Sequence, residues 1–136
     1  MQRRLDPRSQ EHLDRAERDR ALARTLITPA QQALSQPPPL DWAVVVAFYA
    51  ALHFVQAYLW EAQRYVPRRH DNMREAVRDT YQLRSARQEY ARLLDRSWQA
   101  RYVSRFRITE QDTTALVQRD LEHVRRVALT ALHLPI

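Results

Sequence analysis

The longest apolar stretch in the chain runs from Trp42 to Trp60, and within it only His53 and Gln56 are strongly polar. A helix made from such a stretch is apolar on every face, so we expect other helices to enclose it. Asp41 is a good N-cap just before it. The pattern therefore predicts a buried central helix over about residues 41–64.

Amphipathic segments on both sides of this stretch predict further helices, most of them next to a residue that caps helices well. The expected segments are Ser9 to about Ile27, a short turn of helix over 28–35, residues 72–80 after Asp71 as cap, about Leu83 to Arg105 with a break near 95–97, and a last helix opened by a capping box of Thr109 and Asp112. The three prolines within residues 36–40 predict a rigid spacer.

Apolar residues at steps of three and four give each long segment a face to bury. The expected stripes are Leu13, Ala16, Ala23 and Ile27 in the first helix, Leu83, Ala86, Tyr90, Leu93, Leu94, Trp98 and Tyr102 in the fourth region, and Leu116, Leu121, Val124, Ala128 and Leu132 in the last helix. For the rings of Tyr90, Trp98 and Tyr102 we favour burial in the core, with stacking of a nucleic-acid base at Trp98 as the alternative.

The chain has no glycine and no cysteine. Phosphate-binding loops, the serine-nucleophile elbow and tight hairpin turns all need glycine, so those enzyme classes and a β-sheet fold are disfavoured. No period of 20 to 50 residues repeats. We therefore expect one all-α domain over residues 1–136, a four- to five-helix up-and-down bundle with loose ends at 1–8 and 134–136.

The net charge is +6, and all 22 basic residues are arginine. Arginine binds phosphates with two parallel hydrogen bonds and stacks on bases, so RNA is a reasonable partner. Codon bias together with ordinary solvated helix faces is the alternative explanation. His53 and Gln56 lie in the middle of the apolar stretch and would be costly in lipid, which predicts a cytoplasmic protein with no membrane span.

None of the five histidines has a second histidine or a carboxylate at a convincing ligand spacing along the chain, so we expect neither a metal nor a cofactor. For His53, flanked by Leu52 and Phe54, we favour a buried histidine bonded to a neighbouring helix over a ligand. The loop from Arg64 to His70 is the densest basic patch in the sequence and includes Arg68 and Arg69.

Three blocks in order resemble the HEPN superfamily of small helical domains: FYAALHFVQAYL after a DWA start, a His-led turn RHDNMR, and YARLLDRSWQARY. The similarity spans about Leu13 to Leu132. It implies a helical bundle that dimerises and, in active members, a metal-independent endoribonuclease. In those members an Arg and a His, with four to six residues between them, face their copies across the dimer axis.

In the third block Arg96 fits the first motif position, but Arg101 stands where the His would be. Arginine stays protonated near neutral pH and is a poor general base. The resemblance therefore implies catalytic candidates Arg96, Arg101 and His70, the last as the only nearby base. The candidate RNA contacts are Arg64, Arg68, Arg69, Arg74, Trp98 and Tyr102.

Two classes of function follow from these features. The first is an RNA-binding homodimer of a toxin–antitoxin or phage-defence lineage, with weak or no nuclease activity. Within this class, the alternative is a metal-independent endoribonuclease toxin that uses Arg96 and a non-standard base. The second is a structural module that holds a protein partner, for instance of nucleotidyltransferase type.

Overall fold

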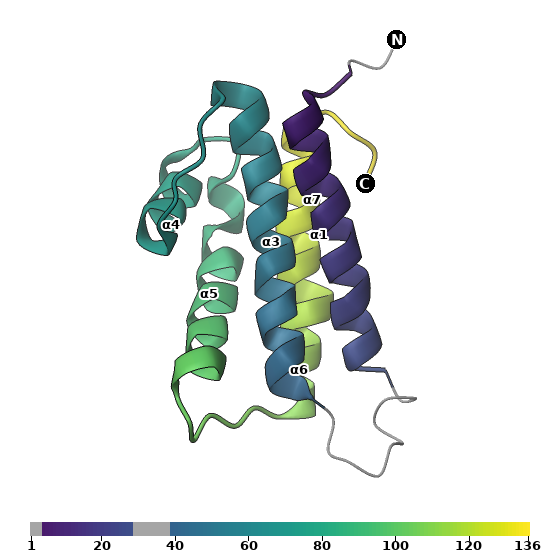
Figure 1. Ribbon diagram of the computed structural model, residues 1–136, viewed down its shortest axis with the longest axis vertical. Coiled ribbons are helices and arrows are strands. Elements are labelled where there is room, and N and C mark those ends of the chain that lie inside the picture. The colour runs from purple at the N-terminus through teal and green to yellow at the C-terminus, as the bar shows by residue number, and fades with distance from the viewer. Residues whose placement is uncertain (1–3, 29–38) are drawn as a thin grey trace.

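The computed structural model describes residues 4–28 and 39–136, and within them every regular element is helical. Four long helices run alternately up and down the molecule (Figure 1), which confirms the all-α fold. The helices are α1 (Pro7–Leu26), α3 (Leu40–Gln63), α4 (His70–Asp79), α5 (Arg87–Tyr102), α6 (Glu110–Ala115) and α7 (Leu121–Ala131), with a 3-10 turn η1 (Arg84–Ala86) and a π-helical turn η2 (Leu116–Asp120). The helical turn expected over 28–35 and the spacer expected over 36–40 lie largely outside the described residues.

α1 begins earlier than expected because Asp6, not Ser9, is its N-cap. Asp6 Oδ1 accepts a hydrogen bond from the backbone N–H of Arg8 at 2.9 Å, and Pro7 takes the first helical position, where its missing N–H costs nothing. Ser9 lies inside the helix and is buried. The predicted stripe is confirmed, since Leu13, Ala16, Ala23 and Ile27 are all buried.

α3 ends near the expected residue, but its start is not capped as predicted. Pro39 occupies the N-cap position and no side chain caps the helix. Asp41 lies in the first turn, where its negative carboxylate interacts favourably with the positive end of the helix dipole. At the other end the backbone of Arg64 enters the left-handed region, with φ 55°, and the helix stops there.

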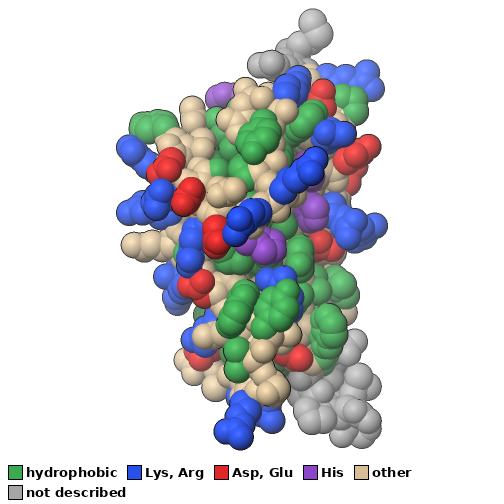
Figure 2. Space-filling model, turned by 60° about the vertical axis from the view of Figure 1, so that its left-hand side comes forward, with side chains coloured by type: hydrophobic (Ala, Val, Ile, Leu, Met, Phe, Trp, Pro, Cys, Tyr) green, Lys and Arg blue, Asp and Glu red, His purple; other side chains and the backbone are tan. Residues whose placement is uncertain are grey.

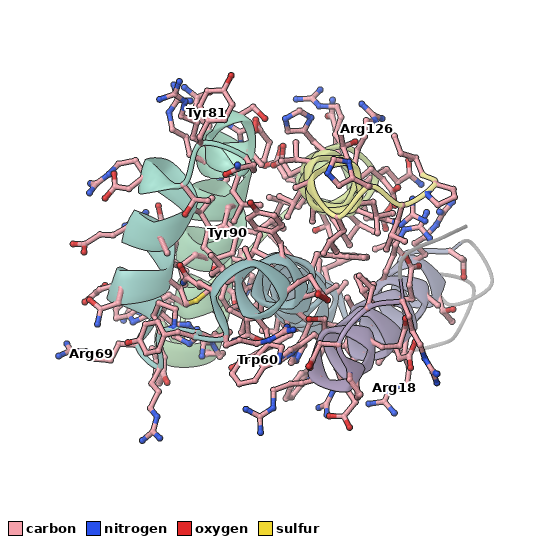
Figure 3. All side chains as sticks on the ribbon, turned by 90° about the horizontal axis from the view of Figure 1, so that it is seen from above. Arg18, Trp60, Arg69, Tyr81, Tyr90 and Arg126 are labelled. Carbon is pink, nitrogen blue, oxygen red and sulfur yellow. The ribbon has the colours of Figure 1, made fainter. Side chains whose placement is uncertain are left out.

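α3 is buried on three sides and open along one stripe. It packs against α1, α5 and α7, and no described helix lies in front of it in Figure 1. Figure 3 shows Trp60 on this open side. The stripe follows steps of three and four and consists of Trp42, Val46, Tyr49, His53, Gln56 and Trp60, which are half-buried or exposed. The prediction that other helices enclose every face is wrong, because polar side chains and rings with polar atoms gather on this stripe.

By length and composition α3 is also able to cross a membrane. Its most apolar 18-residue window is 67% buried inside the fold, which is the behaviour of a core helix. The packing of α3 therefore supports the sequence argument against a membrane span.

α4 and α5 depart from the expected boundaries. α4 begins at His70, so Asp71 is its second residue and not its cap. α5 continues without the break expected at 95–97 and ends at Tyr102, short of the predicted end, because the backbone of Val103 is extended.

The rings along α5 divide between core and surface. Tyr90 is fully buried and points inward from α5 (Figure 3). Trp98 is 53% exposed and Tyr102 is 65% exposed, so burial in the core is the wrong interpretation for these two. Their spacing matches that of the core stripe, but they lie on the last turns of the helix.

The last helical segment starts and packs as predicted. Thr109 Oγ1 accepts a hydrogen bond from the backbone N–H of Asp112 at 3.0 Å. The expected stripe of Leu116, Leu121, Val124, Ala128 and Leu132 is buried. Within η2 the buried Asp120 receives two bonds from Arg92, at 3.0 and 3.1 Å, and these join the last helix to α5.

Candidate functional site

Five of the predicted site residues meet in one open hollow. The hollow lies between the start of α4 and the last turns of α5, and its volume is about 670 Å³. We call it the His70/Arg101 hollow, and it is lined by Arg69, His70, Asp71, Trp98, Arg101 and Tyr102. On the face shown in Figure 2, hydrophobic side chains gather next to arginine and histidine side chains.

His70 is held neutral at the edge of this hollow. Its ring meets the buried ring of Phe48 edge-on, with centroids 5.3 Å apart. Burial lowers the pKa of His70 below 6.5, the positive charge of Arg101 lowers it further, and Asp71 acts in the opposite direction. No described residue hydrogen-bonds to its ring nitrogens. A neutral imidazole is able to accept a proton at neutral pH.

Arg101 is fixed by ring side chains and keeps one free donor. Its Nη1 donates to the Tyr49 hydroxyl at 3.2 Å, and its Nε donates to the Ser97 carbonyl at 3.3 Å. Its guanidinium carbon lies 5.2 Å from the Tyr102 ring and 6.0 Å from the Phe48 ring. Nη2 is buried without a partner among the described residues. A buried unpaired donor is costly, so the Arg101 side chain gains hydrogen-bond energy by turning toward an anion in the hollow.

Trp98 and Tyr102 form an exposed aromatic pair beside the two basic groups. Their ring centroids are 5.5 Å apart and their planes are tilted by 49°. Exposed rings next to arginine are the usual combination for stacking bases while cations hold the phosphates. Trp42, which is 62% exposed at the start of α3, and Val103, which is 41% exposed, add apolar surface at the same end of the bundle.

Arg96 and Arg74, also predicted as site residues, lie elsewhere. Arg96 is five positions before Arg101, and in an α-helix this separates the side chains by about 140°. It is exposed and its Nη1 lies 3.5 Å from Gln99 Oε1. Arg74 pairs with Asp95 at 2.7 Å and does not line the hollow.

Arg64 and Arg68 line a second hollow, between the start of α1 and the end of α3, together with Arg8, His12, Gln56, Trp60, Tyr65, Val66 and Pro67. Arg64 lies 3.7 Å from Asp6 and 3.7 Å from Glu61, so its charge is largely balanced. Arg64 and His70 line different hollows, so the basic loop that joins them does not bring its two ends to one site.

His53 is half-buried and bonded to a neighbouring helix, as expected. Its partner is His12 on α1, with the two Nδ1 atoms 3.1 Å apart. The sequence analysis did not single out His12, since 41 positions separate the two. Tyr49 was also missed; the signal for it was a polar ring one turn before His53 on an otherwise apolar helix.

Comparisons of the chain with protein-family models, with curated proteins and with solved structures find no match. Membership of the HEPN superfamily therefore stays a prediction from the three sequence blocks.

Proposed function

We propose that this chain is an RNA-binding helical protein that holds the RNA backbone in the His70/Arg101 hollow. One observation carries the proposal: Arg69, Arg101 and His70 converge beside the exposed rings of Trp98 and Tyr102. The net charge of +6 attracts a polyanion from a distance. Arg101 lines the hollow, and its buried Nη2, which has no partner among the described residues, gains an acceptor when the side chain turns toward a phosphate oxygen.

The proposal is tested by the affinity for a labelled single-stranded RNA, measured by fluorescence anisotropy in EDTA at several salt concentrations. Arg101→Ala removes charge-assisted hydrogen bonds worth about 1.5–3 kcal/mol, which weakens binding about 10- to 100-fold. Trp98→Ala removes stacking worth about 1–3 kcal/mol per base. Arg96→Ala is the matched control on the same helix and leaves the affinity unchanged. Equal affinities for wild type and Arg101→Ala would refute the site.

The same proposal includes a homodimer, because the hollow adjoins uncovered apolar surface. Trp42, Trp98, Tyr102 and Val103 are exposed, and α3 has an open stripe. Large exposed apolar patches mark interaction sites. Light scattering should give twice the chain mass of 16.2 kDa. A monomer that still binds RNA would remove the dimer from the proposal and leave the binding site.

The resemblance to the HEPN superfamily implies a toxin–antitoxin or phage-defence setting for such a dimer. If RNA does not bind in a salt-dependent way, the hollow belongs instead to a protein partner, and the nucleotidyltransferase-type partner becomes the first to test by co-expression.

A second candidate function is cleavage of the bound RNA by its own 2′-hydroxyl. The neutral His70 next to Arg101 favours it, because this chemistry needs a proton acceptor and a cation beside the phosphate. His70 takes the 2′-hydroxyl proton and the 2′-oxygen attacks phosphorus. The bond to the 5′-oxygen then breaks and that oxygen takes a proton from the imidazolium, which leaves a 2′,3′-cyclic phosphate and a 5′-hydroxyl.

Cleavage is assayed with mixed RNA in EDTA, and the 2′,3′-cyclic ends are identified by mass spectrometry. His70→Ala abolishes cleavage if this candidate is correct, whereas Arg96→Ala does not. The absence of any cleavage by wild type would leave RNA binding as the function. Loss of cleavage in Arg96→Ala alone would contradict the assignment of the reaction to this hollow.

A further inference from the structure

His12 on α1 and His53 on α3 face each other across the open side of the bundle. Their Nδ1 atoms are 3.1 Å apart, and their rings are 5.3 Å apart with planes tilted by 28°. A neutral imidazole offers one N–H donor and one acceptor, so one ring donates to the other here. The two nitrogens therefore share a single proton between them.

This spacing is also the one that a metal ion requires. With metal–nitrogen distances of about 2.0–2.1 Å and bond angles between about 90° and 109°, two ligating nitrogens lie about 2.8–3.4 Å apart. The Nδ1 atoms of His12 and His53 fall within that interval, at 3.1 Å, so α1 and α3 can keep their positions while the two rings turn until both lone pairs point to one metal ion. A metal ion that takes both lone pairs leaves each ring with its proton on Nε2, so one proton moves within a ring and none is released.

A third donor lies beside the pair. Gln56 follows His53 by three residues on α3, and its side chain lies within reach of the His53 ring. Its Oε1 is buried and hydrogen-bonds to no other described residue. Gln56 and His12 line the same hollow, which opens the His12 side of the pair to solvent. A buried carbonyl oxygen with no further partner beside two imidazoles is an arrangement that a cation stabilises.

We propose that His12 and His53 bind a late first-row divalent metal ion through their Nδ1 atoms, with Gln56 Oε1 as the third donor. The ion joins α1 to α3 at the surface of the bundle. This site is separate from the His70/Arg101 hollow and does not depend on RNA binding.

The charges around the pair decide which metal is preferred. Arg8 lies near His12, Arg15 and Arg18 lie near His53, and Glu11 near His12 carries the opposite charge. Three arginines against one carboxylate make the surroundings of the pair net positive, which disfavours a dication and favours the ion with the strongest bond to imidazole. By the Irving–Williams order this ion is Cu²⁺, ahead of Ni²⁺ and Zn²⁺.

The test is isothermal titration of the full, untagged and metal-free chain with CuCl₂ and, separately, ZnCl₂ in a non-coordinating buffer at neutral pH. We expect one Cu²⁺ per chain, bound more tightly than Zn²⁺, with nitrogen hyperfine coupling in the electron paramagnetic resonance spectrum. His12→Gln and His53→Gln each weaken Cu²⁺ binding at least 10-fold. His123→Ala on α7, whose ring bonds to the Ser85 carbonyl, is the matched control and binds as wild type does.

Thermal unfolding gives an independent readout, because a ligand that binds only the folded state raises Tm. Cu²⁺ raises the Tm of wild type and His123→Ala but not that of His12→Gln. If His53→Gln does not fold, His12→Gln decides the question. No binding to wild type below millimolar Cu²⁺, or equal binding by wild type and His12→Gln, would overturn the proposal.

Discussion

Removing the hydroxyl of Tyr90 should make the protein more stable. Tyr90 is fully buried within the core, and its Oη has no hydrogen-bond partner among the described residues. Burial without a partner also explains why the pKa of this phenol is raised. In the unfolded chain the same hydroxyl bonds to water, so folding loses that hydration without replacing it. Tyr90→Phe keeps the ring and its packing against Phe48, whose centroid lies 5.9 Å away, and removes only the unpaired group.

The magnitude follows from the cost of an unpaired buried polar group, about 1–3 kcal/mol. Part of it is offset by the small void that the missing oxygen leaves, so we expect the free energy of unfolding to rise by about 1–2 kcal/mol. With an unfolding entropy of about 2.1 cal/mol/K per residue, a chain of 136 residues gains about 3–7 °C in Tm.

The assay is urea unfolding followed by circular dichroism, with wild type and both tyrosine variants in the same buffer. Tyr49→Phe is the matched control, since the Tyr49 hydroxyl accepts a bond from Arg101 Nη1 at 3.2 Å and its removal should lower stability by about 0.5–1.5 kcal/mol. If Tyr90→Phe is as stable as wild type or less stable, the hydroxyl has a partner in solution and the reasoning fails.

Three further changes test other parts of the fold. Asp6→Ala should lower the Tm, because it removes the N-cap of α1 and the bond from Trp60 Nε1 at 2.8 Å, and thermal unfolding measures this. Asp120→Ala removes both bonds from Arg92, whose side chain is 53% exposed and remains solvated; urea unfolding should show a loss of about 0.5–1.5 kcal/mol, and a variant as stable as wild type would contradict the pair's role. For His70 the folded pKa lies below 6.5, so the unfolded state binds more protons and stability falls as pH drops below about 6.5. His70→Gln should therefore lose less stability between pH 7.5 and 5.5 than wild type, and identical pH profiles would refute this.

The helices were predictable from apolar spacing, but their starts were less so. Thr109 was identified correctly because it is followed at the right distance by Asp112. The prediction that Ser9 caps α1 was wrong because Asp6, three residues earlier, is also a good cap. Contacts far along the chain reinforce Asp6: its backbone N–H donates to Glu61 at 2.8 Å, and a sequence window at the first helix does not contain that residue.

The sequence predicted most residues of the candidate site, but it did not predict which of them lie together in one hollow. His70 and Arg101 were both named, yet Arg96 was grouped with them because sequence position within a motif does not reveal which face of α5 turns toward α4. Trp98 and Tyr102 continue the spacing of the core stripe, so only the fold shows that they are exposed. The pairing of distant residues such as His12 and His53 depends on how α1 lies against α3.

The π-helical turn η2 explains an irregular spacing in the last helix. Leu116 and Leu121 are both buried although they are five positions apart, and in a regular α-helix they would point about 140° away from each other. The wide turn absorbs one additional residue, so Asp120 reaches Arg92 while Leu121 still enters the core. An alignment with any relative whose last helix is regularly wound will therefore need a one-residue gap within Leu116–Asp120, and without that gap every apolar position after it will be matched to the wrong face.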